Sequence, residues 1–141
     1  MRPFAKTLAT AVVALLVCSP AWAELVHFTA HLSTAAEVPT KTGPGTGMAD
    51  ATLDTASAMF NYTIRYANLS GPATAAHFHG PANTMETAGV AIKIEGSLGS
   101  PIKGEAHLTR EQVNDLMQGR WYVNVHTASN PSGEIRGQMK R

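Results

Sequence analysis

The sequence contains a single cysteine, Cys18, and this residue lies in an N-terminal segment with the features of a cleaved export signal. The domain that follows would therefore have no disulfide and no thiolate ligand or nucleophile. Any metal site in it must use nitrogen, oxygen or methionine sulfur. Because no disulfide is available, the fold must be held together by its hydrophobic core, which is feasible for one domain of this length.

Sequence patterns of several common enzyme classes are also missing. The chain has no Gly-x-Ser-x-Gly elbow, no Walker loop and no Gly-x-Gly-x-x-Gly pattern. The glycines at Gly43 and Gly45 are followed by neither a lysine nor a helical pattern, so this stretch is interpreted as a turn and not as a phosphate-binding loop. These absences favour a non-catalytic protein over an enzyme.

The N-terminal segment predicts export. Arg2 and Lys6 precede an apolar run that is too short to cross a bilayer, and a small-x-small pattern ends at Ala23. We expect residues 1–23 to be a signal peptide and residues 24–141 to form one domain, located in the periplasm or secreted. Lipid attachment at Cys18 is the alternative, but the bulky Val17 before it disfavours that processing.

The charge of the remaining domain is close to neutral. Without the leader, 9 of the 11 basic residues remain against 10 acidic residues, which gives a net charge of about −1. A domain without a basic surface is not expected to bind nucleic acid or an anionic membrane. We expect no membrane span after signal cleavage, and the sequence does not predict an oligomeric state.

Short apolar-polar alternation dominates the rest of the chain. Such alternation has the period of a β-strand, and turn-forming residues separate the alternating stretches. Residues 58–66 alternate most regularly, with Phe60, Tyr62, Ile64 and Tyr66 on one face. The expected strands are 25–32, 47–53, 58–66, a strand around His77, 90–95, 102–108, 121–126 and 134–139. About eight strands predict an all-β fold, an antiparallel Greek-key-like β-sandwich or barrel.

One short helix interrupts the strands. Thr109 and Gln112 have the spacing of a capping box, and an apolar stripe follows before Gly119. We expect this helix to pack over an end of the sheet in a structural role. In the strands, we expect Val90, Ile92 and Ile94 to face inward. In the last strand, we expect Glu134, Arg136 and Gln138 to face outward.

The most informative polar pattern is His77-Phe78-His79. In a strand these two histidines share one face, about 6–7 Å apart along the chain. His126 ends another predicted strand and supplies a candidate third ligand. Three imidazoles suit Cu(II) or Zn(II), and the Irving–Williams order favours copper. Ligation at about 2 Å requires the three nitrogens to lie within about 3–4 Å of one another.

Other polar residues leave alternatives open. The same histidines in a hydrogen-bonded cluster with Tyr122 and Asn124 would need no metal. Glu134 and Arg136 share a strand face, where they form a cross-strand ion network or orient His126. Glu37, in a predicted loop, is a further candidate oxygen ligand.

The remaining histidines form no second site by spacing. His27 and His31 lie about 13 Å apart on one predicted strand, too far for one ion. His107 lies beside Glu105 and Lys103 on a face that we interpret as exposed.

Four motifs occur in an order that resembles the chordin-type CHRD domain. They are Glu37-Val38-Pro39, the stretch 75–80 (Ala-Ala-His-Phe-His-Gly), the stretch 121–127 (Trp-Tyr-Val-Asn-Val-His-Thr) and the stretch 133–138 (Gly-Glu-Ile-Arg-Gly-Gln). The resemblance covers roughly residues 26–139, although Thr40 stands where the family often has a second proline. It implies a secreted all-β module, found in repeats in chordin, which binds bone morphogenetic proteins, and as a single exported domain in bacteria.

A looser similarity is to copper/zinc superoxide dismutase, which also places His-x-His on a strand of a Greek-key barrel. Its bridging histidine, zinc-loop ligands and disulfide cysteines have no counterparts in order here. Three hypotheses follow: an exported metal-binding CHRD protein, a scaffolding module that contacts an extracellular or periplasmic protein partner, and a dismutase-like metalloenzyme, which the sequence supports least.

Overall fold

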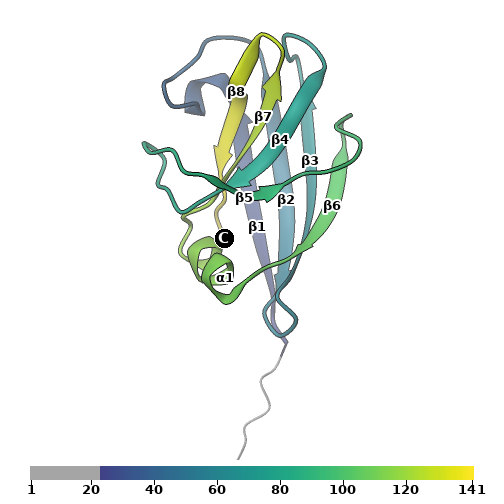
Figure 1. The fold of residues 1–141 in the computed structure, drawn as a ribbon, viewed down its shortest axis with the longest axis vertical. Helices are drawn as coiled ribbons and strands as arrows, with labels where there is room; N and C mark the ends of the chain where they lie inside the picture. Colours follow the sequence, from purple (N-terminus) through teal and green to yellow (C-terminus); the bar gives the residue numbers. More distant parts are fainter. Residues whose placement is uncertain (1–22) are drawn as a thin grey trace, which may run out of the picture.

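The computed structural model describes residues 23–141, so the predicted signal segment lies almost wholly outside the described residues. The described chain forms eight strands, one 3-10 turn and one α-helix (Figure 1). In chain order these elements are β1 (Leu25–Ser33), η1 (Thr34–Ala36), β2 (Thr46–Asp54), β3 (Met59–Ala67), β4 (Ala73–His79), β5 (Val90–Lys93), β6 (Ile102–His107), α1 (Arg110–Met117), β7 (Tyr122–Thr127) and β8 (Asn130–Gln138). The all-β prediction with one short helix is confirmed.

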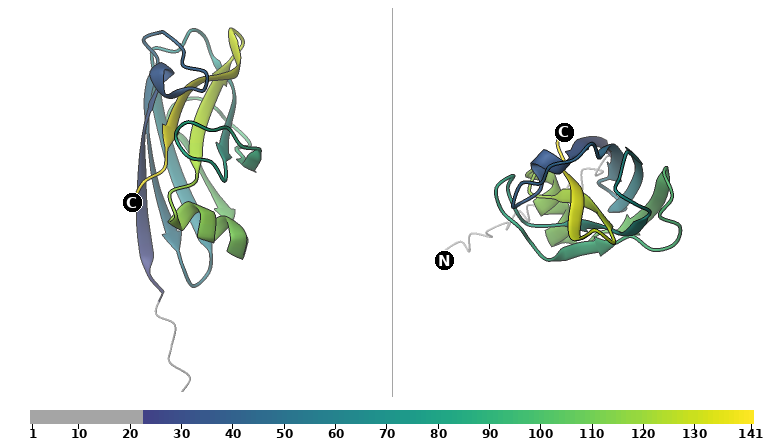
Figure 2. Two further views of the ribbon diagram at one scale, coloured as in Figure 1. Left: turned by 90° about the vertical axis from the view of Figure 1, so that its left-hand side faces the viewer. Right: turned by 90° about the horizontal axis from the view of Figure 1, so that it is seen from above.

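All eight strands pair antiparallel in one sheet, in the order β5-β4-β7-β8-β1-β2-β3-β6. The sheet curls into a nearly closed barrel (Figures 1 and 2). β1 pairs with β2 along its whole length, whereas it meets β8 at the pair Ser33 and Arg136. The backbones of Thr29 and Lys140 form one more bridge below that point. The barrel is therefore continuous from β5 to β6, which are its two edge strands.

The core follows the predicted alternation. In β1, the residues Val26, Phe28, Ala30 and Leu32 are buried while the residues between them are exposed. The aromatic rings of Phe60, Phe78 and Trp121 meet edge to face or tilted inside the barrel, at centroid separations of 5.2–6.1 Å. Such pairs add to the stability gained from apolar burial. The core thus fixes Phe78 inward, which turns its neighbours in β4 to the opposite face.

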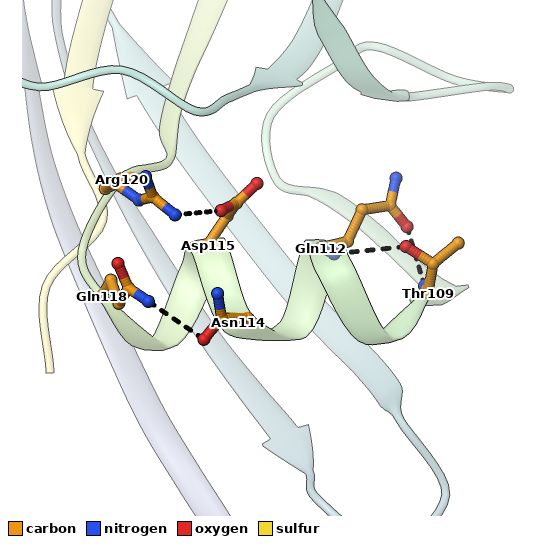
Figure 3. A network of polar contacts seen from close by, with 6 residues as sticks. All are labelled: Thr109, Gln112, Asn114, Asp115, Gln118 and Arg120. Atoms are coloured by element: carbon orange, nitrogen blue, oxygen red, sulfur yellow. Dashed lines mark hydrogen bonds and ion pairs between the residues drawn. The ribbon is translucent and has the colours of Figure 1, made fainter.

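The helix α1 begins with the predicted capping box. Thr109 caps it by accepting a hydrogen bond from Gln112 N, and the Gln112 side chain accepts one from Thr109 N (Figure 3). Asp115 forms an ion pair with Arg120 just beyond the helix, and Leu116 is fully buried. No described helix is long and apolar enough to cross a membrane.

One prediction of side-chain direction is wrong. Val90 was expected inward but is 53% exposed, because an irregularity in the register of β4 and β5 sets it opposite His79 and not on the face of Phe78. Glu134 and Arg136 point away from the core, as expected, on the face opposite Ile135, yet they are only 4% and 2% exposed. The segment 34–45 and the loop 80–89 fold over that face: Lys41 Nζ donates to Gly133 O at 2.6 Å, and Arg136 donates to a carbonyl of the loop 80–89.

Candidate metal centre

Two paired strands bring the three predicted histidines together. In the antiparallel pair of β4 and β7, His77 lies opposite Asn124, and His126 lies opposite Ala75. His77 and His126 are therefore diagonal neighbours on one face, with ring centroids 4.8 Å apart. The His77 and His79 rings are 5.5 Å apart on the same face, because Phe78 between them enters the core.

The nitrogen atoms of this face converge. His77 Nδ1 and His126 Nε2 are 3.0 Å apart, and one ligand atom from each of the three histidines lies within 4.8 Å of the other two. Two nitrogens bound to one ion at about 2.0–2.1 Å with an angle near 90° are separated by about 3 Å. The His77–His126 pair has this separation and, without an ion, forms a hydrogen bond in which His77 Nδ1 donates to His126 Nε2. The third nitrogen lies farther away than the 3–4 Å expected from the sequence, within 4.8 Å of the other two.

Backbone carbonyls fix the ring orientations of His79 and His126. His126 Nδ1 donates to Pro131 O at 2.9 Å, and His79 Nδ1 donates to Ala88 O at 3.0 Å. A carbonyl only accepts, so each ring carries its proton on Nδ1 and, when neutral, presents the Nε2 lone pair to the cluster. This arrangement, in which the second nitrogen donates to a carbonyl, is the usual one for metal-ligating histidines.

Burial keeps two of the imidazoles in the form that binds metals. Burial lowers the pKa of His77, and the nearby His126, His79 and Lys93 lower it further. Burial likewise lowers the pKa of His126, although the hydrogen bond to Pro131 acts in the opposite direction. A neutral imidazole has a free lone pair, so neither His77 nor His126 needs to lose a net charge before it ligates.

The expected neighbours of the cluster divide into two groups. Tyr122 stacks on the His79 ring at a centroid separation of 4.8 Å and an interplanar angle of 4°. Asn124 Oδ1 lies 3.0 Å from His79 Nε2. The guanidinium of Arg136 lies over the same Tyr122 ring, 3.6 Å from its centroid. Arg136 therefore contacts the cluster only through Tyr122.

Glu134 belongs to a different network. Its carboxylate accepts hydrogen bonds from Ser70 N at 2.7 Å, from the hydroxyls of Ser70 and Thr127 at 2.5 Å, and from Asn130 at 3.1 Å. These bonds tie the segment after β3 to the β7–β8 turn. Among the hydrogen bonds and ion pairs of the described residues, Glu134 contacts neither His126 nor Arg136, so the role expected for it beside His126 is not seen.

The remaining candidates lie elsewhere. His27 and His31 are exposed on β1, and His107 is exposed on β6. Glu37 is 5% exposed and lies not among the histidine nitrogens but beside the Asn124 amide. Sequence reasoning could not place it, since its segment has no periodicity, and only its position after the first strand set it apart.

The comparison with protein families supplies one match. The family model described as CHRD domain matches residues 28–139, which is nearly all of the described chain. Neither the comparison with curated proteins nor that with solved structures found a match.

Proposed function

This chain belongs to the CHRD domain family, and we propose that it is an exported, non-catalytic binding protein whose imidazoles His77, His79 and His126 hold one transition-metal ion. The observation that carries the proposal is the convergence of one ligand nitrogen from each of the three histidines to within 4.8 Å of one another. With the proton of His126 held on Nδ1 by Pro131 O, its Nε2 lone pair faces the cluster.

Copper is the favoured ion of this proposal, with zinc second. The ligands are imidazole nitrogens with no thiolate, and such sites bind Cu(II) more tightly than other divalent first-row ions. The site is partly buried, with His79 and His126 only 9% and 8% exposed. Such burial limits the water that could compete for the ion and keeps the rings fixed by the strands.

Metal titration of the purified protein tests the proposal. We expect sub-micromolar binding of one Cu(II) per chain, and Zn(II) binding at the same site. His77→Ala and His126→Ala should each weaken binding by at least about tenfold, since each removes a ligand. The matched control is His107→Ala, because His107 is exposed on β6 and outside the cluster. Equal loss in the control, or the absence of sub-micromolar binding, would contradict the proposal.

Export is a separate part of the proposal and rests on the sequence of residues 1–23. N-terminal sequencing of the protein recovered outside the cytoplasm should find Glu24 as the first residue. A lipid-modified Cys18 at the N-terminus, or an unprocessed Met1, would contradict it.

A further inference from the structure

One polar contact beside the histidines is unexplained by the three-imidazole site. His79 Nδ1 lies 3.0 Å from Ala88 O, and its Nε2 lies 3.0 Å from Asn124 Oδ1. A neutral imidazole has one N–H, whereas both of these neighbours are acceptors. With the proton on Nδ1, the Nε2 lone pair of His79 faces a lone pair of the Asn124 carbonyl.

This conflict depends on which end of the Asn124 amide faces His79. An amide can be placed in either of two orientations, and its surroundings decide between them. Asn124 Nδ2 and the Glu37 carboxylate both lie against Gly133. A Cβ atom placed on Gly133 would be 2.5 Å from Asn124 Nδ2 and 2.6 and 3.0 Å from the two carboxylate oxygens, so the two groups are neighbours. A carboxylate only accepts, so it favours the NH2 end and turns the carbonyl oxygen toward His79.

Glu37 is well placed to fix this orientation. It is 5% exposed, and burial raises the pKa of its carboxyl, while the cationic Lys41 and Arg136 and a hydrogen bond from Asn124 act in the opposite direction. Lys41 is itself held by Gly133 O at 2.6 Å, and Arg136 by the Tyr122 ring and Asn83 O. Gly133 leaves room for this contact because it has no Cβ, and its φ of +121° is one that a glycine adopts readily.

Two lone pairs that face each other 3.0 Å apart repel unless a proton or a metal ion lies between them. His77 Nδ1 and His126 Nε2, which share a hydrogen bond of the same length, lie on the neighbouring part of the face. We infer that Asn124 Oδ1 is a fourth ligand of the proposed metal ion, and that Glu37 is a positioning residue which holds the amide oxygen toward the site. This inference rests on the proposed three-histidine site.

The resulting set of three nitrogens and one oxygen has a defined chemical character. Tetragonal sets of nitrogen and oxygen ligands are typical of Cu(II). A neutral amide oxygen adds no charge to the site. The ion would therefore keep its full positive charge, and Glu37, beside the Asn124 amide, lies outside the ligand shell.

Three variants and one control test the inference by Cu(II) titration and by electron paramagnetic resonance of the copper-loaded protein. Asn124→Ala should weaken Cu(II) binding by about tenfold or more and change the copper hyperfine splitting, while nitrogen couplings from three imidazoles remain. Asn124→Asp, which restores an oxygen donor, should recover most of the affinity. Glu37→Gln should shift the spectrum toward that of Asn124→Ala, because the new amide can present its NH2 group to Asn124, whereas a carboxylate only accepts. Asn61→Ala, on the exposed side of β3, is the matched control and should leave both readouts unchanged.

The possible results separate this inference from the proposed function. Unchanged affinity and spectrum in Asn124→Ala, with wild-type protein still binding copper through three imidazoles, would overturn the fourth ligand alone. Absence of Cu(II) binding by the wild type would overturn both. If Glu37→Gln keeps the wild-type spectrum while Asn124→Ala loses Cu(II) affinity, the positioning role of Glu37 is overturned and Asn124 remains a ligand.

Discussion

The buried carboxylate of Glu134 allows a quantitative prediction about stability. It is 4% exposed and accepts four hydrogen bonds from three residues, Ser70, Thr127 and Asn130. Oε1 accepts from Ser70 N, and Oε2 accepts the other three bonds. In Glu134→Gln the oxygen can remain on the side of the three donors, but the new NH2 group then faces the Ser70 N–H.

The expected cost follows from these contacts. The substitution removes one hydrogen bond to a charged group, leaves a buried donor without an acceptor and weakens three further bonds. Since a bond to a charged group contributes about 1.5–3 kcal/mol, we expect Glu134→Gln to lower the free energy of unfolding by about 2–4 kcal/mol at pH 7. Glu105→Gln, on the exposed side of β6, is the control and should change it by less than about 0.5 kcal/mol.

The same contacts give the prediction a pH dependence. Burial of Glu134 raises its pKa, but the hydrogen bonds from Ser70, Thr127 and Asn130 outweigh burial and leave the pKa below its ordinary value of 4.5. The folded state therefore favours the ionised form, and this contribution is fully present above pH 4.5 and lost as the pH falls through the folded-state pKa. Urea unfolding at several pH values should show the difference between wild type and Glu134→Gln shrinking in acid. A difference below about 0.5 kcal/mol at pH 7, or one that grows in acid, would refute the reasoning.

Three further predictions concern the helix, the strand packing and the metal. Thr109→Ala removes the capping box of α1 and should cost about 1 kcal/mol in urea unfolding; an unchanged midpoint would contradict it. Gly137→Ala places a Cβ 2.5 Å from His31 O, a backbone atom that cannot move aside by rotating a side chain. It should lower the free energy of unfolding by about 1–3 kcal/mol or more. A soluble variant of wild-type stability would contradict the β1–β8 packing. Cu(II) at about 100 times its dissociation constant should stabilise the protein by about 2.7 kcal/mol in thermal unfolding, and a chelator should reverse this; equal stabilisation of His126→Ala would contradict the site.

The sequence predicted what depends on local periodicity. The alternation in β1 and β3 placed the core correctly, and the Thr109 and Gln112 spacing gave the helix start. The same-face position of His77 and His79 follows from the period of a strand alone. These features need no knowledge of which strands pair.

The rest depends on strand order and on loops, neither of which leaves a periodic signal. His126 meets His77 because β7 pairs with β4 in a register that sets His126 opposite Ala75, a choice no local pattern reveals. Glu134 and Arg136 face outward, as the alternation predicts, but the segments covering β8 bury them, and no periodic pattern shows which loops cover a strand. Asn124 was expected only as a neighbour of the cluster, since Glu37, which lies beside its amide, comes from a distant segment.

X-ray absorption spectroscopy of the metal-loaded protein tests the central claim most directly. For one bound Zn(II) or Cu(II), the three-histidine site predicts three imidazole nitrogens at about 2.0–2.1 Å in the wild type and two in His126→Ala. His107→Ala should retain all three, because His107 lies outside the cluster. Fewer than three imidazoles in the wild type, or a shell that His126→Ala leaves unchanged, would contradict the account.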